Sequence, residues 1–297
     1  MMCVKEHIKH LMVRLKFPDD AQRELIAAFD RITTSKSCDV FADLLAQYDA
    51  DADCDYKAML EVATQLANTV EIHAYTVSLL LFLCMSKTLL ERYRSEGVAE
   101  GIYYRSMEDL AYKLEECRLV YGVNGSFVAS WFSGFFKMAR FGLGRLQFEI
   151  KQTEEVFLLN GRVVPSGSKV INIHIPRTGT KLCHKEVLES YRLAAEHFSN
   201  VFPEEQILFI CKSWLLDPWN LSVLKPGSNL REFCLDFEIV KTGEYEDYRE
   251  LWRLFDCEYT GDAAKLPRDS SLRRAYADRV ARGERIGWGI GMFSYQP

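Results

Sequence analysis

Apolar residues recur at every third or fourth position along the first part of the chain, which is the spacing of an amphipathic α-helix. This spacing predicts helices over 4–15, 25–32, 58–66, 70–93 and 107–121. Pro18 is the only proline among the first 125 residues, so little interrupts helical structure there. Ser106, with Asp109 three residues later, resembles a capping box, and Gly122 fits the position just past a helix. We therefore predict an all-α first half.

The period changes to two after Trp131, where apolar and polar residues alternate as in half-buried strands. Strands are predicted over 146–150, 155–159, 162–164, 169–175, 206–211, 230–240 and 286–293. Helices are predicted over 184–201, 245–255 and 271–282. Asn160-Gly161, between two of the strands, is the strongest short-range hairpin signal.

Together the two patterns predict a mixed α+β fold class. An all-α N-terminal domain over 1–130 should be followed by a mixed α/β C-terminal domain over 131–297. The segment 121–126 contains two glycines and is the best candidate for a link between the helical and mixed halves.

Composition narrows the class of protein without deciding its function. With 297 residues, 48% of them hydrophobic and 27% charged, the chain can bury the core of one large or two ordinary globular domains. A net charge of −5 argues against a nucleic-acid binder, because such proteins neutralise phosphates with a basic surface. We expect no nucleic-acid partner.

Cysteine usage and the N-terminus indicate a cytoplasmic protein. The nine cysteines form no CxxC pair and most lie in apolar runs, which is typical of reduced, buried thiols. The N-terminal segment carries charges throughout and lacks the apolar core of a signal peptide. The longest uncharged stretch, 72–86, is shorter than the roughly 20 residues that span a bilayer. It is therefore predicted to be a buried helix, and no membrane partner is expected.

A loop between a predicted strand and a predicted helix is the first candidate for ligand chemistry. Its residues are Arg177, Thr178, Gly179, Thr180 and Lys181. Two cations and backbone N–H groups at the start of a helix provide the local chemistry of a phosphate site. The alternative is an ordinary polar connection whose basic residues are solvated.

Two residues are candidates for a general base. His174 is the only histidine on a predicted strand, shares a strand face with Asn172, and lies next to the loop 177–181. An imidazole there could take a proton from an amine or hydroxyl nucleophile. The alternative is a hydrogen-bonded structural histidine. Glu149 is the second candidate, although alternation alone also allows it to face solvent.

The segment after the strand 206–211 holds further polar candidates. Ser213, Trp214 and Asp217 could contact a substrate, and Asp217 could orient a base. The alternative is a buried hydroxyl and a capping aspartate before Pro218. No metal is expected, because His7 and His10 have no carboxylate or cysteine set to complete a site.

Six strings along the chain resemble, in consistent order, a bacterial family of two-domain acyltransferase-like proteins. That family has a helical N-acyltransferase N-terminal domain and a GNAT-like C-terminal domain. The strings are Gly101-Ile102-Tyr103-Tyr104 with Asp109-Leu110, Gly144-Arg145-Leu146-Gln147-Phe148-Glu149, Asn172-Ile173-His174-Ile175-Pro176, Ser213-Trp214-Leu215-Leu216-Asp217-Pro218, Gly227-Ser228-Asn229-Leu230 and Gly287-Trp288-Gly289-Ile290-Gly291.

The resemblance implies transfer of an acyl group from acyl-CoA. In GNAT folds the fourth strand and the start of the next helix hold pantetheine and pyrophosphate, which corresponds by order to 169–175 and the loop after it. The sequence departs from the pyrophosphate signature of that superfamily. At Arg177-Thr178-Gly179 the spacing is one residue short, and the second small residue is missing.

We therefore expect an acyl-CoA-dependent N- or O-acyltransferase of GNAT-like fold, acting on a small-molecule or peptide acceptor. The loop 177–181 would hold the pyrophosphate, and His174, Glu149 and Asp217 would be catalytic. Asn172, Ser213 and Trp214 would bind substrate. The alternative is a non-catalytic GNAT-like protein that binds a ligand or partner. The sequence leaves the oligomeric state open.

Overall fold

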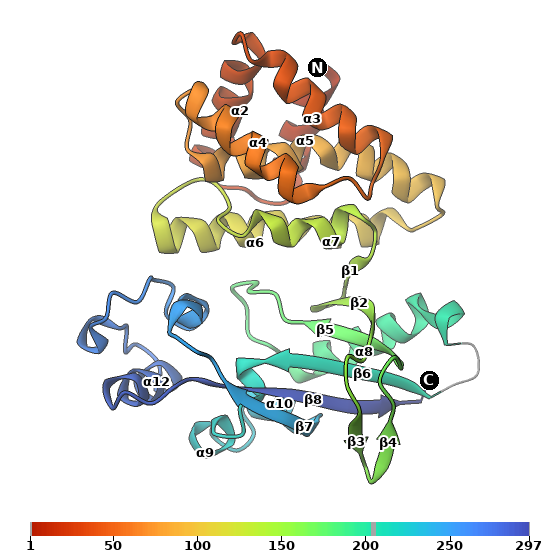
Figure 1. Cartoon of the computed structure of the whole chain (residues 1–297), viewed down its shortest axis with the longest axis vertical. Coiled ribbons are helices and arrows are strands. Elements are labelled where there is room, and N and C mark those ends of the chain that lie inside the picture. The colour runs from red at the N-terminus through yellow and green to blue at the C-terminus, as the bar shows by residue number, and fades with distance from the viewer. Residues whose placement is uncertain (1, 203–205, 297) are drawn as a thin grey trace. The chain divides into compact units, whose positions relative to one another are not determined.

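The computed structural model describes residues 2–202 and 206–296 (Figure 1). The chain divides into two compact units, Met1–Gly142 and Leu143–Pro297. Helices make up the first unit and a mixed sheet with helices makes up the second, so the predicted fold class is confirmed. The domain boundary after residue 130 stays a prediction, because compactness alone does not show where a domain folds independently.

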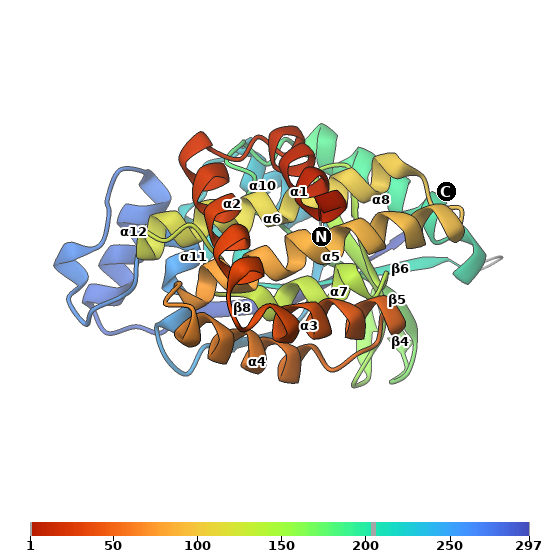
Figure 2. The ribbon, with the colours of Figure 1, turned by 90° about the horizontal axis from the view of Figure 1, so that it is seen from above.

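Six long helices build the first unit. They are α1 (Met2–Arg14), α2 (Asp19–Thr34), α3 (Cys38–Ala50), α4 (Tyr56–Thr69), α5 (Ala74–Ser95) and α6 (Glu100–Tyr121), followed by the short α7 (Ser133–Phe136). The central helix is α5, which packs against the other five long helices (Figure 2). It is the one described helix long and apolar enough to cross a membrane, but 72% of its apolar window is buried inside the fold. This is the burial expected of a core helix.

One prediction for the first unit was wrong, and one helix was missed. Ser106 is not an N-cap: α6 begins at Glu100, and Ser106 is fully buried and accepts a hydrogen bond from the Gly142 N–H at 2.9 Å. The helix α3 was not predicted, although Phe41, Leu44 and Tyr48 form its buried stripe. Gly122 ends α6 with a left-handed φ of 68°, as predicted.

The second unit is built on a mixed sheet with the strand order β2-β5-β6-β8-β7. The bounds are β2 (Leu146–Gln152), β5 (Lys169–His174), β6 (Ile207–Ser213), β7 (Glu238–Glu244) and β8 (Gly287–Tyr295), and β1 (Arg140–Leu143) lies at the division between the units. Neighbouring strands are antiparallel except for β5 and β6, which are parallel and joined through α8 (His184–His197).

The two faces of this sheet differ. On one face, Phe209 and Phe293 stack on each other and both contact Tyr191 of α8. On the other, which we call the hairpin face, β3 (Phe157–Leu159) and β4 (Arg162–Val164) form a hairpin that packs on Val170 and Met292. Asn160 and Gly161 form the predicted hairpin turn with φ values of 50° and 73°, as a type I′ turn requires.

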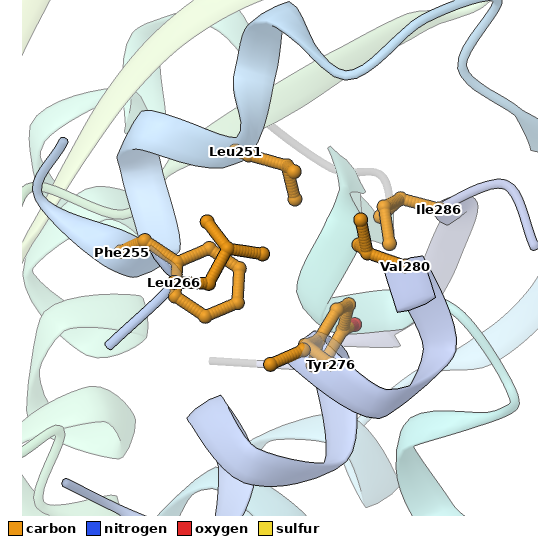
Figure 3. Close-up of a cluster of buried hydrophobic side chains, with 7 residues drawn as sticks. Leu251, Phe255, Leu266, Tyr276, Val280 and Ile286 are labelled. Carbon is orange, nitrogen blue, oxygen red and sulfur yellow. The ribbon is translucent and has the colours of Figure 1, made fainter. Parts of the chain in front are cut away.

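The predicted strand over 230–240 was wrong in its first half. That half is α10 (Asn229–Leu235), which buries Phe233 and Cys234. Only the end of the predicted strand belongs to β7. The helix predicted over 245–255 is reduced to a 3₁₀ turn (Arg249–Leu251) and α11 (Trp252–Phe255). These short elements pack with α12 (Ser271–Ala281) in a cluster of apolar side chains that point toward one another (Figure 3).

Candidate functional site

The parallel ladder between β5 and β6 stops before the C-terminal ends of both strands. This ladder consists of two residue pairs, Ile171 with Phe209 and Asn172 with Ile210. Yet β5 stays paired with β2 as far as His174, and β6 stays paired with β8 as far as Ser213. The ends of β5 and β6 therefore present backbone N–H and C=O groups that the ladder between them does not use. We call this opening the β5–β6 fork.

His174, at the end of β5, forms a pair with Glu149 of β2. The Nε2 atom of His174 lies 2.8 Å from Oε1 of Glu149, and the Nδ2 atom of Asn172 lies 3.1 Å from the same oxygen. The register brings these residues together, because Glu149 pairs with Asn172 and Gln147 with His174 on one face of the sheet. The structure thus joins three of the residues that the sequence analysis named separately.

The hydrogen bonds around Glu149 select one tautomer of His174. Both carboxylate and imidazole would be acceptors if Nε2 carried no proton, and they would then repel each other at 2.8 Å. The network is satisfied when Nε2–H donates to Glu149, which leaves the ring's lone pair on Nδ1. The contact of 3.0 Å between Asn172 Nδ2 and Nε2 is then proximity rather than a hydrogen bond.

Glu149 is buried, with an exposed fraction of 6%, contrary to the alternative that placed it in solvent. Its Oε1 atom also lies 3.1 Å from the Lys151 ammonium. Three donors therefore converge on one carboxylate oxygen. A carboxylate held in this way orients the imidazole and stabilises the positive charge that the ring gains when it takes a proton. The pair has the geometry of a general base with its orienting partner.

The loop 177–181 is placed directly before α8, but its arginine is already engaged. Arg177 lies 2.9 Å from Asp256, which also binds Arg273. Thr178 and Thr180 bond to each other through their hydroxyls at 2.8 Å, and Lys181 is exposed. Gly179 has a φ of 74°, a conformation that glycine adopts readily. The loop can present cations and hydroxyls to an anion if Arg177 exchanges its carboxylate partner.

Ser213, Trp214 and Asp217 take part in local structure instead of joining His174. The Ser213 hydroxyl accepts from the Leu215 N–H at 3.1 Å, and the Trp214 ring packs edge-on against Tyr276. Asp217 forms a buried ion pair of 2.6 Å with Arg279. For Asp217 these contacts agree with a structural role, whereas Ser213 is half-buried rather than buried.

The described residues were also compared with the requirements of metal binding and of thiol chemistry. The residues that the structure describes contain no group of three His, Cys, Asp or Glu side chains that could hold a metal ion. The eight cysteines whose side chains are described are free thiols, of which four are buried and four are partly buried, and Cys3 lies outside them. Burial raises the pKa of the Cys211 thiol to about 12, so it stays protonated at neutral pH.

Sequence reasoning missed Lys212 of β6 and Trp288 of β8. The ammonium of Lys212 lies 4.3 Å from the centroid of the Trp288 ring. Both residues lie on the hairpin face, which is the face of the sheet that also carries Glu149 and His174. The alternation of β6 could have revealed Lys212, because it follows Ile210 by two residues.

Comparisons with known proteins agree with this architecture. The N-acyltransferase N-terminal domain matches residues 6–138, and the GNAT-like C-terminal domain matches residues 141–293. No curated protein sequence matches the chain. The chain is similar in fold to an acyltransferase solved with decanoyl-CoA and teicoplanin, with 20% identity, a TM-score of 0.74, and 98% of this chain and 88% of that chain covered. It is also similar in fold to an acyltransferase solved with CoA and 10C-teicoplanin, with 18% identity and a TM-score of 0.64. That match covers 97% of this chain and 99% of that chain.

Proposed function

Because the chain belongs to the family defined by the GNAT-like C-terminal domain, we propose that it transfers an acyl group from acyl-CoA to an amine or hydroxyl acceptor. The observation that carries the proposal is the His174–Glu149 pair at the β5–β6 fork, with 2.8 Å between Nε2 and Oε1. The solved acyltransferases of similar fold hold CoA, decanoyl-CoA or octanoyl-CoA, which supports acyl-CoA as donor. The acceptor is a small molecule or peptide.

The donor would lie in the β5–β6 fork. Backbone groups that the ladder leaves unused there can hydrogen bond the amides of a pantetheine arm and the carbonyl of a thioester. The phosphates would lie at the loop 177–181, where Lys181 is exposed and Arg177 can leave Asp256. In this arrangement the thioester ends near His174, which follows the last ladder pair of β5 by two residues.

His174 would act as general base in the transfer. The acceptor nitrogen or oxygen attacks the thioester carbonyl carbon, and its proton passes to the imidazole of His174. The new C–N or C–O bond forms, the C–S bond breaks, and the sulfur leaves with the electron pair of that bond. The proton held by His174 returns to the sulfur, which yields the acylated acceptor and free CoA thiol. Glu149 keeps the ring in the required tautomer throughout.

We assign the proposed domains as 1–130, helical and N-acyltransferase-like, and 131–297, GNAT-like. Ser213, Trp214 and Asp217 are left out of the proposed site, because their polar atoms or rings are used in local structure. The proposed setting is the cytoplasm, in line with the free thiols of the described cysteines.

A non-catalytic binding protein is the second candidate function, and one observation favours it. Arg177, the only arginine of the loop, is engaged by Asp256 at 2.9 Å, which lowers the positive charge available to a pyrophosphate. Such a protein would bind a ligand at the fork without turning over acyl-CoA.

The test combines binding with turnover. Unfolding temperature would be measured with CoA, acetyl-CoA, octanoyl-CoA and decanoyl-CoA, and a ligand at 100 times its Kd should add about 2.7 kcal/mol of stability. Thiol release from the stabilising acyl-CoA would then be followed with a panel of amines and alcohols, and the acylated product identified by mass. Stabilisation with acceptor-dependent thiol release supports the enzyme. Stabilisation without release supports the binding protein, and no stabilisation by any of the four excludes both uses of CoA.

A further inference from the structure

The carboxylate of Asp256 lies between two arginines from different parts of the second unit. Its Oδ2 atom lies 2.9 Å from Nη2 of Arg177, in the loop before α8, and Nη2 of Arg273, in α12, donates to the same oxygen. Two guanidinium groups that converge on one anionic oxygen form a clamp for an oxyanion. We call Arg177 and Arg273 the arginine clamp. The anion that the clamp holds in this structure is supplied by the chain itself.

The Asp256 side chain is held by the arginine clamp alone. Among the described residues, its carboxylate makes no other hydrogen bond or ion pair. Asp217, whose carboxylate pairs with Arg279, is different, because its Oδ1 atom also accepts a hydrogen bond from the Trp219 N–H at 3.1 Å. A carboxylate that lacks such a backbone bond can leave when a second anion competes for the same guanidinium groups.

The backbone that carries Asp256 is anchored, while the clamp is partly open to solvent. Phe255, the preceding residue, is 1% exposed and belongs to the apolar cluster that also contains Tyr276 of α12 (Figure 3). This cluster therefore fixes both α11 and the helix that carries Arg273. The side chain of Arg177, by contrast, is 33% exposed. The clamp is thus a positioned pair of cations that a ligand can reach from the side of Arg177.

The backbone conformation of Asp256 is left-handed, with a φ of 58° and a ψ of 26°, at the C-terminal end of α11. Glycine adopts this conformation most readily, and asparagine and aspartate tolerate it better than other residues. Replacement of Asp256 by glycine or asparagine therefore removes the negative charge from the clamp without forcing the backbone into a new shape.

We propose that the arginine clamp binds a phosphate group of the acyl-CoA donor, and that Asp256 is an internal competitor which this phosphate displaces. The inference rests on the proposed function and adds Arg273 of α12 to the phosphate site at the loop 177–181. Guanidinium groups present paired N–H donors that suit phosphate as well as carboxylate. A phosphate offers several anionic oxygens, so both arginines keep a partner after the exchange. Until then, the Asp256 carboxylate offsets the repulsion between the two cations and thereby lowers the affinity for the donor.

The test compares two ligands by calorimetric titration of the full chain. One is CoA, and the other is pantetheine, which has the same thiol-bearing arm and no phosphate. The variants are Asp256→Gly, Asp256→Asn, Arg273→Gln and, as the matched control, Asp269→Asn. Asp269 also pairs with Arg273, at 2.9 Å from its Nη1 atom, but its side chain is 68% exposed and it forms no ion pair with Arg177.

Asp256→Gly and Asp256→Asn should each lower the Kd for CoA by about tenfold, the size expected of one charge-assisted contact, and leave the Kd for pantetheine unchanged. The gain should shrink as salt rises, because the phosphate then meets two cations without an internal partner and their attraction is screened. Arg273→Gln should raise the Kd for CoA. Asp269→Asn should stay within about twofold of the parent, because an exposed ion pair contributes little.

Three results would overturn the proposal. The first is CoA affinity in both Asp256 variants that does not exceed the parent's, which would leave the acyltransferase itself intact. The second is lower stability together with weaker CoA binding in both, which would make Asp256 a structural link. The third, independent of the Asp256 variants, is unchanged CoA affinity in Arg273→Gln. Tighter CoA binding by the Asp256 variants without acceptor-dependent thiol release would support the clamp and reject the transfer.

Discussion

Two histidine–carboxylate pairs in the second unit have the same contact distance and different surroundings. Nε2 lies 2.8 Å from a carboxylate oxygen both in His174–Glu149 and in His184–Asp236. The first pair joins neighbouring strands at the β5–β6 fork. The second joins the first residue of α8 to the end of α10, and Asp236 also accepts from the Tyr191 hydroxyl at 3.2 Å.

The difference shows that a contact distance does not by itself identify catalysis. Burial raises the pKa of Asp236, and the bonds from His184 and Tyr191 partly offset that rise. That pair fixes one helix to another. The His174–Glu149 pair lies instead where a ladder ends and backbone groups stay available to a ligand. In the proposed function, position relative to the fork is what distinguishes His174 as a base from His184 as a structural link.

The largest effect is expected at His174. Loss of a general base costs roughly 10²–10⁴-fold in rate, so His174→Ala should lower kcat by that factor while donor binding is kept. His184→Ala, the matched control, should leave kcat within a few-fold and lower stability instead. The measurement is steady-state thiol release together with the thermal shift by acyl-CoA. Equal losses of kcat in the two variants would remove the distinction between the pairs.

Glu149→Gln tests the orienting role of the carboxylate. A glutamine amide can donate to Nε2, which would favour the other tautomer and remove the lone pair from Nδ1. In an enzyme where an orienting aspartate was replaced by its amide, kcat fell by about 10⁴, so a loss approaching that size is expected. Asp236→Asn is the control. A Glu149→Gln variant with the parent's kcat would mean that the tautomer is set by something else.

Asp217→Ala should destabilise the fold without acting on the chemistry. The change leaves Arg279 buried without its 2.6 Å partner, and breaking a buried pair in this way costs about 3–5 kcal/mol. Chemical denaturation measures the loss in the free energy of unfolding. If Asp217→Ala instead kept its stability and lost kcat, the residue would belong to the catalytic group after all.

The Arg177–Asp256 pair is the half-buried counterpart and should exchange partners when a phosphate binds. Arg177→Ala with Lys181→Ala should weaken acyl-CoA binding by about tenfold at low salt, from loss of charge-assisted contacts. The loss should shrink as salt rises, because screening weakens the parent's contacts. Calorimetric titrations at two ionic strengths measure this. Unchanged affinity in the double variant would move the phosphates away from the loop.

His7 forms no ion pair with any carboxylate among the described residues, and it should act through stability alone. Its Nε2 lies 3.0 Å from the Ser86 hydroxyl, and burial, with smaller contributions from nearby charges, lowers its pKa to about 4 from 6.5. Between these values the unfolded chain binds the extra proton, so stability should fall as pH drops from about 6.5 towards 4. His7→Gln should flatten that slope in denaturation curves at pH 7 and pH 5. The same slope in both proteins would assign the acid sensitivity to other groups.

Local signals predicted local structure well and long-range pairing poorly. Asn160-Gly161 fixed the hairpin because the turn depends on those two residues. The stretch 230–240 was mistaken for a strand because its apolar pattern suits either period until Phe233 and Cys234 are seen buried on one helix face. His174 and Glu149 were each named as candidates, but they are 25 residues apart, and their pairing depends on the antiparallel register of β2 and β5. The ion pair of Asp217 could not be predicted, because its partner, Arg279, lies 62 residues away.

The most direct test of the central claim is the pH dependence of acyl transfer in the parent, His174→Ala and His184→Ala. An unperturbed imidazole titrates near pH 6.5, and a general base is inactive once it is protonated. If His174 is the general base, kcat/KM falls on the acidic side in the parent and in His184→Ala, and this acidic limb is absent from the residual activity of His174→Ala. An acidic limb retained in His174→Ala and lost in His184→Ala would contradict it.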